Sequence, residues 1–382
     1  MRLFWLACSV IFPVLVAGCV STKYQGPVPE EALTQTQQRL LQSEAVVFQL
    51  KRRQRLYDLS WPLLAANTDL CPVTRQSIGV VLADLEAYAK FIGGMSADEL
   101  AAVGIADDLH ILHVNKGSPA DLAGFKAGMF IRAVNGEDVS GEKPGVVAKK
   151  ITASIDEHEL VTIRVMDGGA ERDINSEATE VCDVAVKLST SSSINALARD
   201  KTIAINAGLM RAADDDLVQY VIAHELAHVA LRHPRKGAYN TVVSGAIVYG
   251  PVIYAGGALV DRALRLFKVD TPESLGMKWL SAVVPFSREF EAEADYVGLY
   301  MLARIGGNIE RAAEIFSLFS REGPSSTWIR YTHPLTPERY VATELAIEEI
   351  RAKIAAGEDL MPEKRWIYGR AGETIKVIHS DE

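Results

Sequence analysis

The sequence predicts an α+β protein, with a small β-rich domain at residues 93–178 and a mainly helical domain at residues 183–360. The chain has 382 residues, 48% of them hydrophobic, so it is long enough for two or three folded domains and too apolar for a disordered chain. Short alternating runs separated by turn dipeptides fill the first region. Longer stretches with helical spacing fill the second.

The charge and the cysteine count exclude several classes of protein. There are 40 Lys and Arg against 49 Asp and Glu, which gives a net charge of −9. We therefore expect no nucleic-acid partner, because modules that bind nucleic acid carry a basic face. Four cysteines are too few for a small disulfide scaffold. The mean hydropathy of +0.08 is slightly high for a soluble acidic protein and indicates that some segments are markedly apolar.

The N-terminus has the pattern of a secretory signal peptide at residues 1–18, followed by a tether at residues 19–29. Residues 3–16 are almost wholly apolar, and this run is too short to span a bilayer. The small residues before Cys19 resemble a bacterial lipobox, which implies that the Cys19 thiol is acylated, as with palmitate. Val20 in place of Asp implies a lipid anchor in the outer membrane, facing the periplasm. An ordinary signal peptide is the alternative.

Residues 30–92 are predicted to form an N-terminal helical region that packs on the helical domain. Helical spacing without a breaker covers residues 30–59, whereas two prolines and a glycine argue against long elements at residues 59–79. A basic cluster at residues 51–55 is expected on a solvated helix face, and contact with anionic lipid is the alternative.

Two cysteines remain once the signal peptide is removed and Cys19 is acylated. These are Cys71 and Cys182. In an oxidising compartment we expect them to form a disulfide that joins the N-terminal region to the start of the C-terminal half.

The β-rich domain shows strand and turn signals in sequence. Strands are expected at residues 108–114, 131–137 and 160–166, with a short helix at 144–153. An Asn-Gly turn closes the second strand. His110 and His113 fall in the first strand, where a core or exposed role is favoured over metal binding.

Three motifs in this region resemble a bacterial PDZ domain. They are Gly-Ser-Pro-Ala at 117–120, Ala-Gly-Met at 127–129 and the run at 131–137. The resemblance implies that the domain binds extended or C-terminal peptide segments by adding a strand to a sheet edge. It also implies a carboxylate-binding loop at Ala102-Val103-Gly104-Ile105, although Ala102 stands where the family usually has Gly. A domain that serves only as a spacer is the alternative.

The strongest chemical signal is His224-Glu225-Leu226-Ala227-His228, which lies in a stretch of helical spacing after three aspartates. Positions i and i+4 place both imidazoles on one helix face, where they can hold one zinc ion. Glu225 is offset by one residue, so its carboxylate can take a proton from water beside the metal and deliver it to the leaving amine. His233 is expected to cap the end of this helix rather than bind metal.

A third ligand is expected from a second helix that begins near Ser287 and ends before two glycines. Glu291 and Asp295 are four residues apart and share a face. Glu291 would bind the metal, and Asp295 would hold a ligand imidazole by its other nitrogen. Glu289 and Glu293 are expected to be solvated.

Together the two motifs, with Ile194-Asn195-Ala196 before them, resemble metallopeptidase family forty-eight, which contains the CAAX prenyl proteases. The resemblance implies a gluzincin-type zincin domain with one Zn²⁺ per chain, and with the ligands, base and supporting Asp295 assigned above. It implies that substrate lies on an edge strand containing Asn195 and Ala196. His333, in a His-Pro pair, is then an oxyanion stabiliser or a reversible plug of the open zinc position. A structural loop histidine is the alternative.

Local sequence signals predict the structure of two further segments. Thr336 and Pro337 predict the start of a helix that runs to about Ala356 with Gly357 at its end, before a tail at 361–382. Residues 241–260 carry no charge and are just long enough to span a membrane. Four glycines and a central proline favour two short helices or a lid over the cleft.

The function predicted from these features is a lipid-anchored zinc metalloendopeptidase. It would cleave misfolded or stalled envelope proteins, which the PDZ-like domain selects. One alternative is a PDZ-guided chaperone or adaptor with a mostly latent zinc site. Another is an integral-membrane protease, which requires that residues 241–260 span the bilayer. The sequence does not identify the physiological substrate or the cleavage preference.

Overall fold

The computed structural model describes the chain from the start of the N-terminal helix to the end of the last helix, with gaps. The described residues are 30–92, 95–103, 105–158, 160–236, 288–321, 333 and 336–363. The signal peptide, Cys19 and the apolar segment 241–260 lie outside them. Among the described helices, none combines the length and the apolar character needed to cross a membrane.

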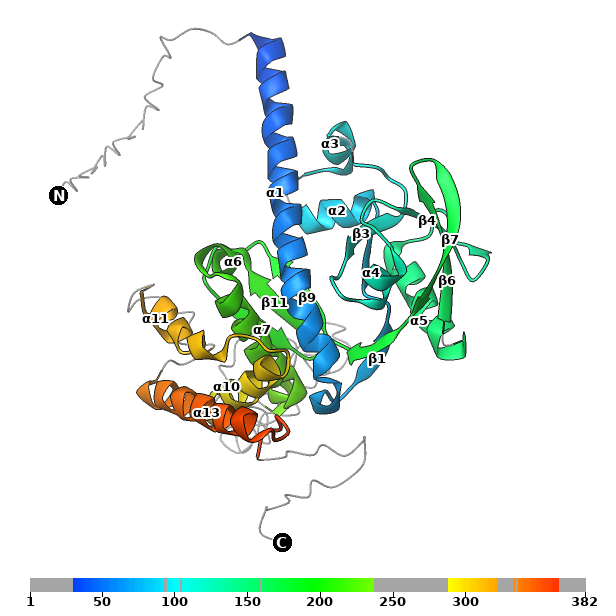
Figure 1. The fold of residues 1–382 in the computed structure, drawn as a ribbon. Helices are drawn as coiled ribbons and strands as arrows, with labels where there is room; N and C mark the ends of the chain where they lie inside the picture. The colour runs from blue at the N-terminus through cyan, green and yellow to red at the C-terminus, as the bar shows by residue number, and fades with distance from the viewer. Residues whose placement is uncertain are drawn as a thin grey trace, which may run out of the picture.

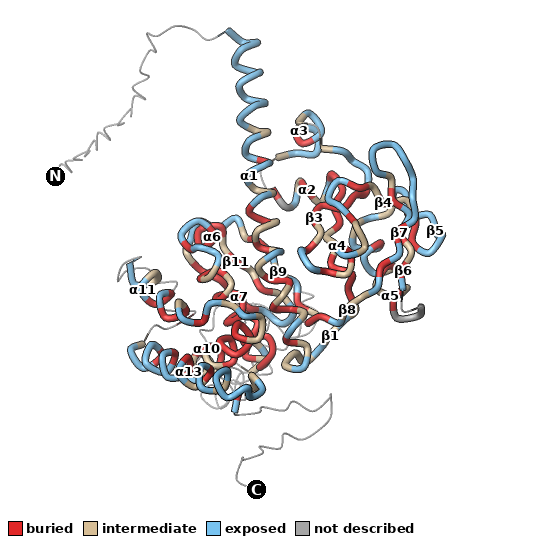
Figure 2. Tube along the Cα trace, viewed as in Figure 1, coloured by how far each residue is buried: buried red, intermediate tan, exposed pale blue. Residues whose placement is uncertain are grey.

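One long helix, α1 (Glu31–Ala66), runs past two folded units (Figure 1). Val46 in its N-terminal half packs against the β-rich unit, and Leu56 and Leu63 in its C-terminal half lie in the core of the helical unit. The first turns of the helix are exposed and the later turns are largely buried (Figure 2). The predicted packing of this region on the helical domain therefore applies to the C-terminal half of α1 only.

The β-rich unit is an antiparallel sheet with one long helix packed on it. The strand order is β2-β3-β4-β6-β7, with the short β5 paired to β4. The strands are β2 (Val80–Ala83), β3 (His110–Val114), β4 (Phe130–Val134), β5 (Glu137–Asp138), β6 (Leu160–Asp167) and β7 (Ala170–Glu177). Val147 and Ile151 of α5 (Pro144–His158) contribute to the core that the sheet forms.

Turns and short helices complete the β-rich unit. Asn135 and Gly136 have φ values of 47° and 83°, so the predicted Asn-Gly turn is present. The short helices are α2 (Leu85–Ile92), α3 (Ala97–Ala102) and α4 (Pro119–Ala123). His110 and His113 are buried, and they bond to the Tyr88 hydroxyl and the Asp58 carboxylate respectively.

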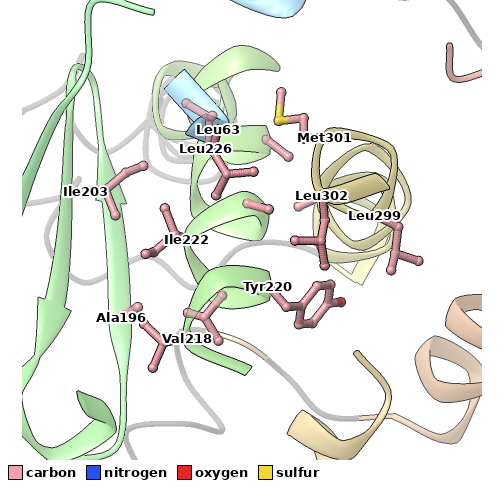
Figure 3. Packing of buried hydrophobic residues seen from close by; sticks show 14 of the residues in the cluster. Leu63, Ala196, Ile203, Val218, Tyr220, Ile222, Leu226, Leu299, Met301 and Leu302 are labelled. Atoms are coloured by element: carbon pink, nitrogen blue, oxygen red, sulfur yellow. The ribbon is translucent and has the colours of Figure 1, made fainter. Parts of the chain in front are cut away.

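The helical unit is built on two packed helices, α7 (Asp215–Ala230) and α10 (Arg288–Arg304). Their shared core contains Tyr220 and Leu226 from α7 and Leu299 and Leu302 from α10, with Ile203 from a neighbouring strand (Figure 3). The other elements are α6 (Ala207–Ala212), η2 (Ile309–Arg311), α11 (Glu314–Arg321) and α13 (Pro337–Ala356). Together the two units give the mixed α+β fold expected from the sequence.

A three-stranded sheet flanks α7. Its order is β10-β11-β9, so β10 (Ala196–Arg199) lies at an edge. The other two strands are β9 (Ala185–Ser189) and β11 (Thr202–Asn206). The edge strand predicted to contain Asn195 and Ala196 thus corresponds to β10 and the residue just before it.

The N-terminal region departs from the prediction in two ways. First, α1 continues through Pro62 to Ala66, because buried Trp61, Leu63 and Leu64 pack into the core and offset the lost backbone bond. Second, the chain then forms η1 (Thr68–Leu70), β1 (Thr74–Ser77) and β2. Strand β2 pairs with β3, so the boundary predicted between residues 92 and 93 divides the sheet of the β-rich unit.

The basic cluster on α1 was also assigned wrongly to a solvated face. Arg52 and Arg53 are buried. The Arg55 guanidinium donates to the Asp215 carboxylate and to the Met210 carbonyl. Arg55 thus ties α1 to the helical unit, where its guanidinium also donates to the Ala213 carbonyl.

Cys71 and Cys182 form a disulfide, the pairing that the sequence suggested. Cys182 ends β8 (Thr179–Cys182), which pairs with β1 in a two-stranded ribbon. The disulfide closes a sequence separation of 111 residues that includes the whole β-rich sheet. The disulfide therefore joins the two segments that connect the β-rich unit to the helical unit.

Candidate metal centre

Helix α7 begins where its sequence predicts. The Asp214 side chain caps the helix by accepting from the Leu217 amide, and two further aspartates occupy the first turn. His224 and His228 lie one turn apart, 7% and 0% exposed, and their Nε2 atoms are 3.0 Å apart. Both imidazoles therefore meet at one point in the interior.

Helix α10 brings two carboxylates to the same point. Glu291 and Asp295 are 0% and 3% exposed. This close approach depends on Gly298, because a Cβ built there would lie 3.0 Å from the Cα and N atoms of His224. Sequence patterns did not identify this glycine, which in the sequence is an ordinary helix interior residue.

The carboxylates take the positions that the two motifs predicted. Glu291 Oε1 is 3.3 Å from Nε2 of His228, and its Oε2 is 3.6 Å from Nε2 of His224. Asp295 Oδ1 is 2.9 Å from Nδ1 of His224, on the side of the ring away from Glu291. Glu291 thus faces the ligand nitrogens, whereas Asp295 orients one of the rings.

The donor set fits a metal ion. Ligand atoms of His224, His228, Glu291 and His333 all lie within 4.8 Å of one another, and all four residues are buried. The Nδ1 atom of each helix histidine is engaged elsewhere, so the Nε2 atoms of two neutral rings would direct lone pairs at each other. A cation between them removes this repulsion. Imidazole nitrogens and a carboxylate are ligands that zinc accepts.

The electrostatics of the site also favour a positive charge. Burial lowers the pKa of His224, but its hydrogen bonds to Asp295 and Glu291 outweigh burial and raise the pKa to about 10. Burial raises the pKa of Glu291, but His333, His224 and His228 together hold that pKa well below its ordinary value. The carboxylate is therefore ionised and available as a ligand.

Glu225 lies beside the four-donor cluster rather than in it. It is 1% exposed, and burial raises the pKa of its carboxyl group against the opposing effect of His333 and His224. Its Oε1 is 3.3 Å from Nε2 of His333, and its Oε2 has no hydrogen-bond partner within the described part of the chain. A buried carboxylate with a raised pKa and an unused oxygen suits a proton acceptor.

His333 reaches the centre from the segment before α13. Its Nδ1 is 3.0 Å from Oε1 of Glu291, and its Nε2 is 3.4 Å from the carbonyl oxygen of Ala196. The predicted edge-strand residues Asn195 and Ala196 therefore border the site, and both line the same small pocket as His224 and Glu225.

Arg339, the arginine that follows the His-Pro pair and that also resembles the family pattern, reaches the site through contacts that the sequence did not predict. It is buried in the first turns of α13, which Thr336 caps and Pro337 opens as predicted. Its Nε donates to Oδ2 of Asp295, and its Nη1 lies 2.9 Å from Oε2 of Glu291. The positively charged guanidinium offsets the negative charge of both carboxylates. Helical spacing in the sequence did not indicate these contacts.

The predictions for His233 and Glu293 were wrong. His233 is 0% exposed, and its Nδ1 is 2.9 Å from Nδ1 of His228 instead of capping a helix. Glu293 is not simply solvated, since its Oε2 is 3.0 Å from Nε2 of His233. Both depart from expectation because α10 lies alongside the end of α7, a contact that helical spacing does not reveal.

The predicted carboxylate-binding loop is not at a sheet edge. Residues 102 and 103 end α3, and Gly104 lies outside the described residues. Val103 and Ile105 pack against the cluster between α1 and the β-rich unit. Among the described strands, β2 and β7 form the two edges of this sheet, and the β2 edge faces α5. The prediction missed β2 because the β-rich domain was expected to begin only at residue 93.

Comparisons with known proteins agree with the metal centre. The comparison with curated proteins finds no match. Residues 166–345 match the model of peptidase family M48. The matched stretch contains the histidine pair of α7, the carboxylates of α10 and His333. The part of the chain that is similar to this family is thus the part that carries the buried donor cluster, which supports a metallopeptidase domain there.

Proposed function

We propose that the protein is a zinc-dependent metalloendopeptidase. The observation that carries the proposal is the convergence of two helix histidines and Glu291 on one buried point, with the carboxylate of Glu225 beside it. A catalytic zinc site has three protein ligands and keeps one further position for water or substrate. When bound, zinc supplies Lewis-acid chemistry: it acidifies water and polarises a carbonyl.

The chain's own residues supply the proton transfers and the orientation. Glu225 accepts a proton from the attacking water and delivers it to the leaving amine. Its raised pKa brings the carboxyl group closer to neutral pH, where it can carry out both steps. Asp295 fixes the ring of His224, and Arg339 in turn fixes Asp295 through two hydrogen bonds.

An extended substrate would lie along β10. Among the described strands it pairs with β11 alone, so its other edge can form backbone hydrogen bonds with a peptide. Asn195 and Ala196 stand where that peptide would reach Glu225 and His333. The apolar side chains of Ile315, Phe316 and Phe319 from α11 line the same pocket.

The test is cleavage of an unfolded protein by the zinc-loaded chain and by Glu225→Gln. We expect the variant to keep its zinc and to lose about 10²–10⁴-fold in rate, the usual contribution of a positioned general base. Glu177→Gln, at an exposed carboxylate of β7, is the matched control and should cleave like the wild type. Undiminished hydrolysis by Glu225→Gln would refute the proposal.

A second candidate is a chaperone or adaptor whose zinc site is mostly latent. It is favoured by one observation, namely that His333 offers a fourth donor within the 4.8 Å cluster and would close the open position. The two candidates differ in turnover. A latent site predicts slow cleavage by the wild type and faster cleavage by His333→Ala. If His333 stabilises the oxyanion instead, the wild type should cleave faster than His333→Ala.

Substrate selection is proposed to occur at the open edge of β2 rather than at residues 102–105. A groove of about 520 Å³ lies between β2 and the first turns of α5. Its lining includes Val80, Val81, Leu82, Lys143, Pro144 and Ala148. An edge strand beside a helix can bind an extended peptide segment by strand addition, as expected for the PDZ-like unit.

The proposed location is the outer membrane, with the protein held by lipid on Cys19 and facing the periplasm. The signal pattern at residues 1–18 supports this proposal. The disulfide supports it independently, because such bonds persist in oxidising compartments. Misfolded or stalled envelope proteins are then the proposed substrates. Globomycin-sensitive processing of the full chain, lost in Cys19→Ala, is the test.

A further inference from the structure

A fourth buried histidine, His233, lies behind the metal centre and has no role in the chemistry proposed above. His233 follows the end of α7, where Arg232 adopts a left-handed conformation with φ of 56° and turns the chain back. The imidazole is fully buried and stacks on the ring of Phe290 in α10, with centroids 4.4 Å apart and planes inclined by 11°. The ring therefore has one defined orientation.

His233 lies between a metal-ligand histidine and a carboxylate. Its Nδ1 is 2.9 Å from Nδ1 of His228, and its Nε2 is 3.0 Å from Oε2 of Glu293. Only one assignment of protons suits a metal on Nε2 of His228. That ring must carry its proton on Nδ1 and donate it to Nδ1 of His233, whose own proton then lies on Nε2 and is donated to Glu293.

We propose that His233 and Glu293 form a positioning relay for His228, in which a neutral imidazole transmits the orienting effect of a carboxylate to a metal ligand. The relay fixes the tautomer and the ring angle of His228, so that its Nε2 lone pair points at the metal position. This inference rests on the proposed zinc site. It does not depend on the peptidase reaction itself.

The two ligand histidines of α7 are thus held in different ways. His224 donates directly to Asp295, which is 3% exposed and also bound by Arg339. On its Nδ1 side, His228 is linked to a carboxylate through His233, whose partner Glu293 has a side chain that is 30% exposed. A carboxylate partner of a ligand histidine makes the ring a better ligand, and its removal typically weakens metal binding by about 10–100-fold.

The experiment measures zinc affinity of the full-length chain by competition with a chelator. His233→Phe keeps a ring against Phe290 but removes both nitrogens, and we expect it to bind zinc about 10–100-fold more weakly. His233→Gln retains an oxygen that can accept the proton from His228, so its loss should be smaller. Glu293→Gln should lose only a few-fold, because the amide oxygen still accepts from His233.

His113→Phe is the matched control. His113 is also a buried histidine that bonds a carboxylate, but it lies in β3, in the β-rich unit. We expect it to bind zinc like the wild type. The absorption spectrum of bound Co²⁺ provides a second readout, which should shift in His233→Phe and not in the control.

Wild-type zinc affinity in His233→Phe would overturn the relay, as would an equal loss in the His113 control. If His233→Phe does not fold, the other two variants provide the test. Zinc affinity should then fall from the wild type to Glu293→Gln and on to His233→Gln, and equal affinities would contradict the proposal. A wild-type chain that binds zinc but cleaves nothing would refute the proposed function alone. A wild-type chain that binds no zinc would refute both.

Discussion

The metal centre and the groove at β2 are built in opposite ways. The metal centre consists mainly of side chains from two packed helices, each of which contributes a pair at a spacing of four, and His333 joins them from the segment before α13. The groove consists of a backbone edge from one segment and the start of a helix some sixty residues later. The metal centre is buried, and contacts between charged side chains hold it together. The groove is open, and the strand pairing of the sheet sets its shape.

This difference explains why one site was predicted and the other was misplaced. A helix imposes its periodicity on the sequence, so His224, His228, Glu291 and Asp295 can be assigned to helix faces from their spacing alone. An edge strand of four residues has no such signature. Its role depends on pairing with β3, which lies beyond the two helices inserted between the strands.

The first prediction concerns the disulfide at the junction of the two units. Replacing Cys71 and Cys182 by Ala should lower the free energy of unfolding by about 2–5 kcal/mol, because the bond closes a long loop. Zinc affinity should change far less, since the metal ligands lie on α7 and α10. Chemical denaturation with and without reductant measures the first effect. Reductant should weaken the wild type alone, and equal stability of both forms would contradict the prediction.

The second prediction concerns the packing that brings the helices together. Gly298→Ala places a Cβ against the backbone of His224, and we expect a loss of about 1–3 kcal/mol in the free energy of unfolding. Zinc affinity should fall as well, because α10 carries Glu291. Gly145→Ala is the control, since a Cβ there meets nothing within 4 Å. Thermal unfolding and zinc titration of both variants provide the measurement. Equal stability and equal zinc affinity of the two variants would contradict the close approach of Gly298 to the backbone of His224.

The third prediction addresses the groove. Ala148 is exposed on α5 and lines the groove, so Ala148→Trp should fill it without disturbing the core. We expect KM for an unfolded protein to rise by about tenfold, equivalent to about 1.4 kcal/mol, with kcat unchanged. Cleavage of a peptide too short to span both sites should not change. Ala153→Trp, on an exposed part of the same helix outside the groove lining, is the control, and an equal effect in both variants would contradict selection at β2.

The smallest effect concerns an ion pair that ties α10 to the chain after α1. Arg304 bonds Asp69 and holds the pKa of that carboxyl below its ordinary value. Its contribution to folding is present above the unfolded pKa of about 3.9 and is lost as the pH falls through the lower, folded pKa. Because the Asp69 side chain is half exposed, Asp69→Asn should cost less than about 1 kcal/mol at pH 7.

The control for this ion pair is Arg304→Met. In that background, Asp69→Asn should change the free energy of unfolding less than in the wild type, and what is left reports the backbone hydrogen bonds that Asp69 also accepts. Denaturation of the wild type, the two single variants and the double variant between pH 3 and pH 7 forms the complete cycle. An effect of Asp69→Asn that grows as the pH falls would have the wrong sign.

Local signals were sufficient for the elements that begin and end with capping residues. The helix from Pro337 to Ala356, with Thr336 before it and Gly357 after it, has the predicted bounds. The start of α7 at Asp214 and the Asn-Gly turn after β4 were predicted equally well. In each case the deciding residues are adjacent in sequence and their backbone preferences act without help from the rest of the fold.

Contacts between elements distant in sequence were not predicted. The buried arginines of α1, the close approach at Gly298 and the contact of His233 with Glu293 each depend on how one helix lies against another. In each case hydrophobic periodicity assigns a residue to a helix face but does not say which other charged or polar group lies opposite. The polar contacts of this site therefore became visible only in the assembled fold.

The most direct test of the central claim is a zinc titration of the metal-free, full-length chain with peptide hydrolysis as the readout. The proposed site predicts that activity rises with added zinc and reaches a plateau at one ion per chain. Glu225→Gln should bind the same single ion and stay inactive. Hydrolysis by the metal-free chain, or full activity of Glu225→Gln, would contradict a zinc peptidase built on His224, His228 and Glu291.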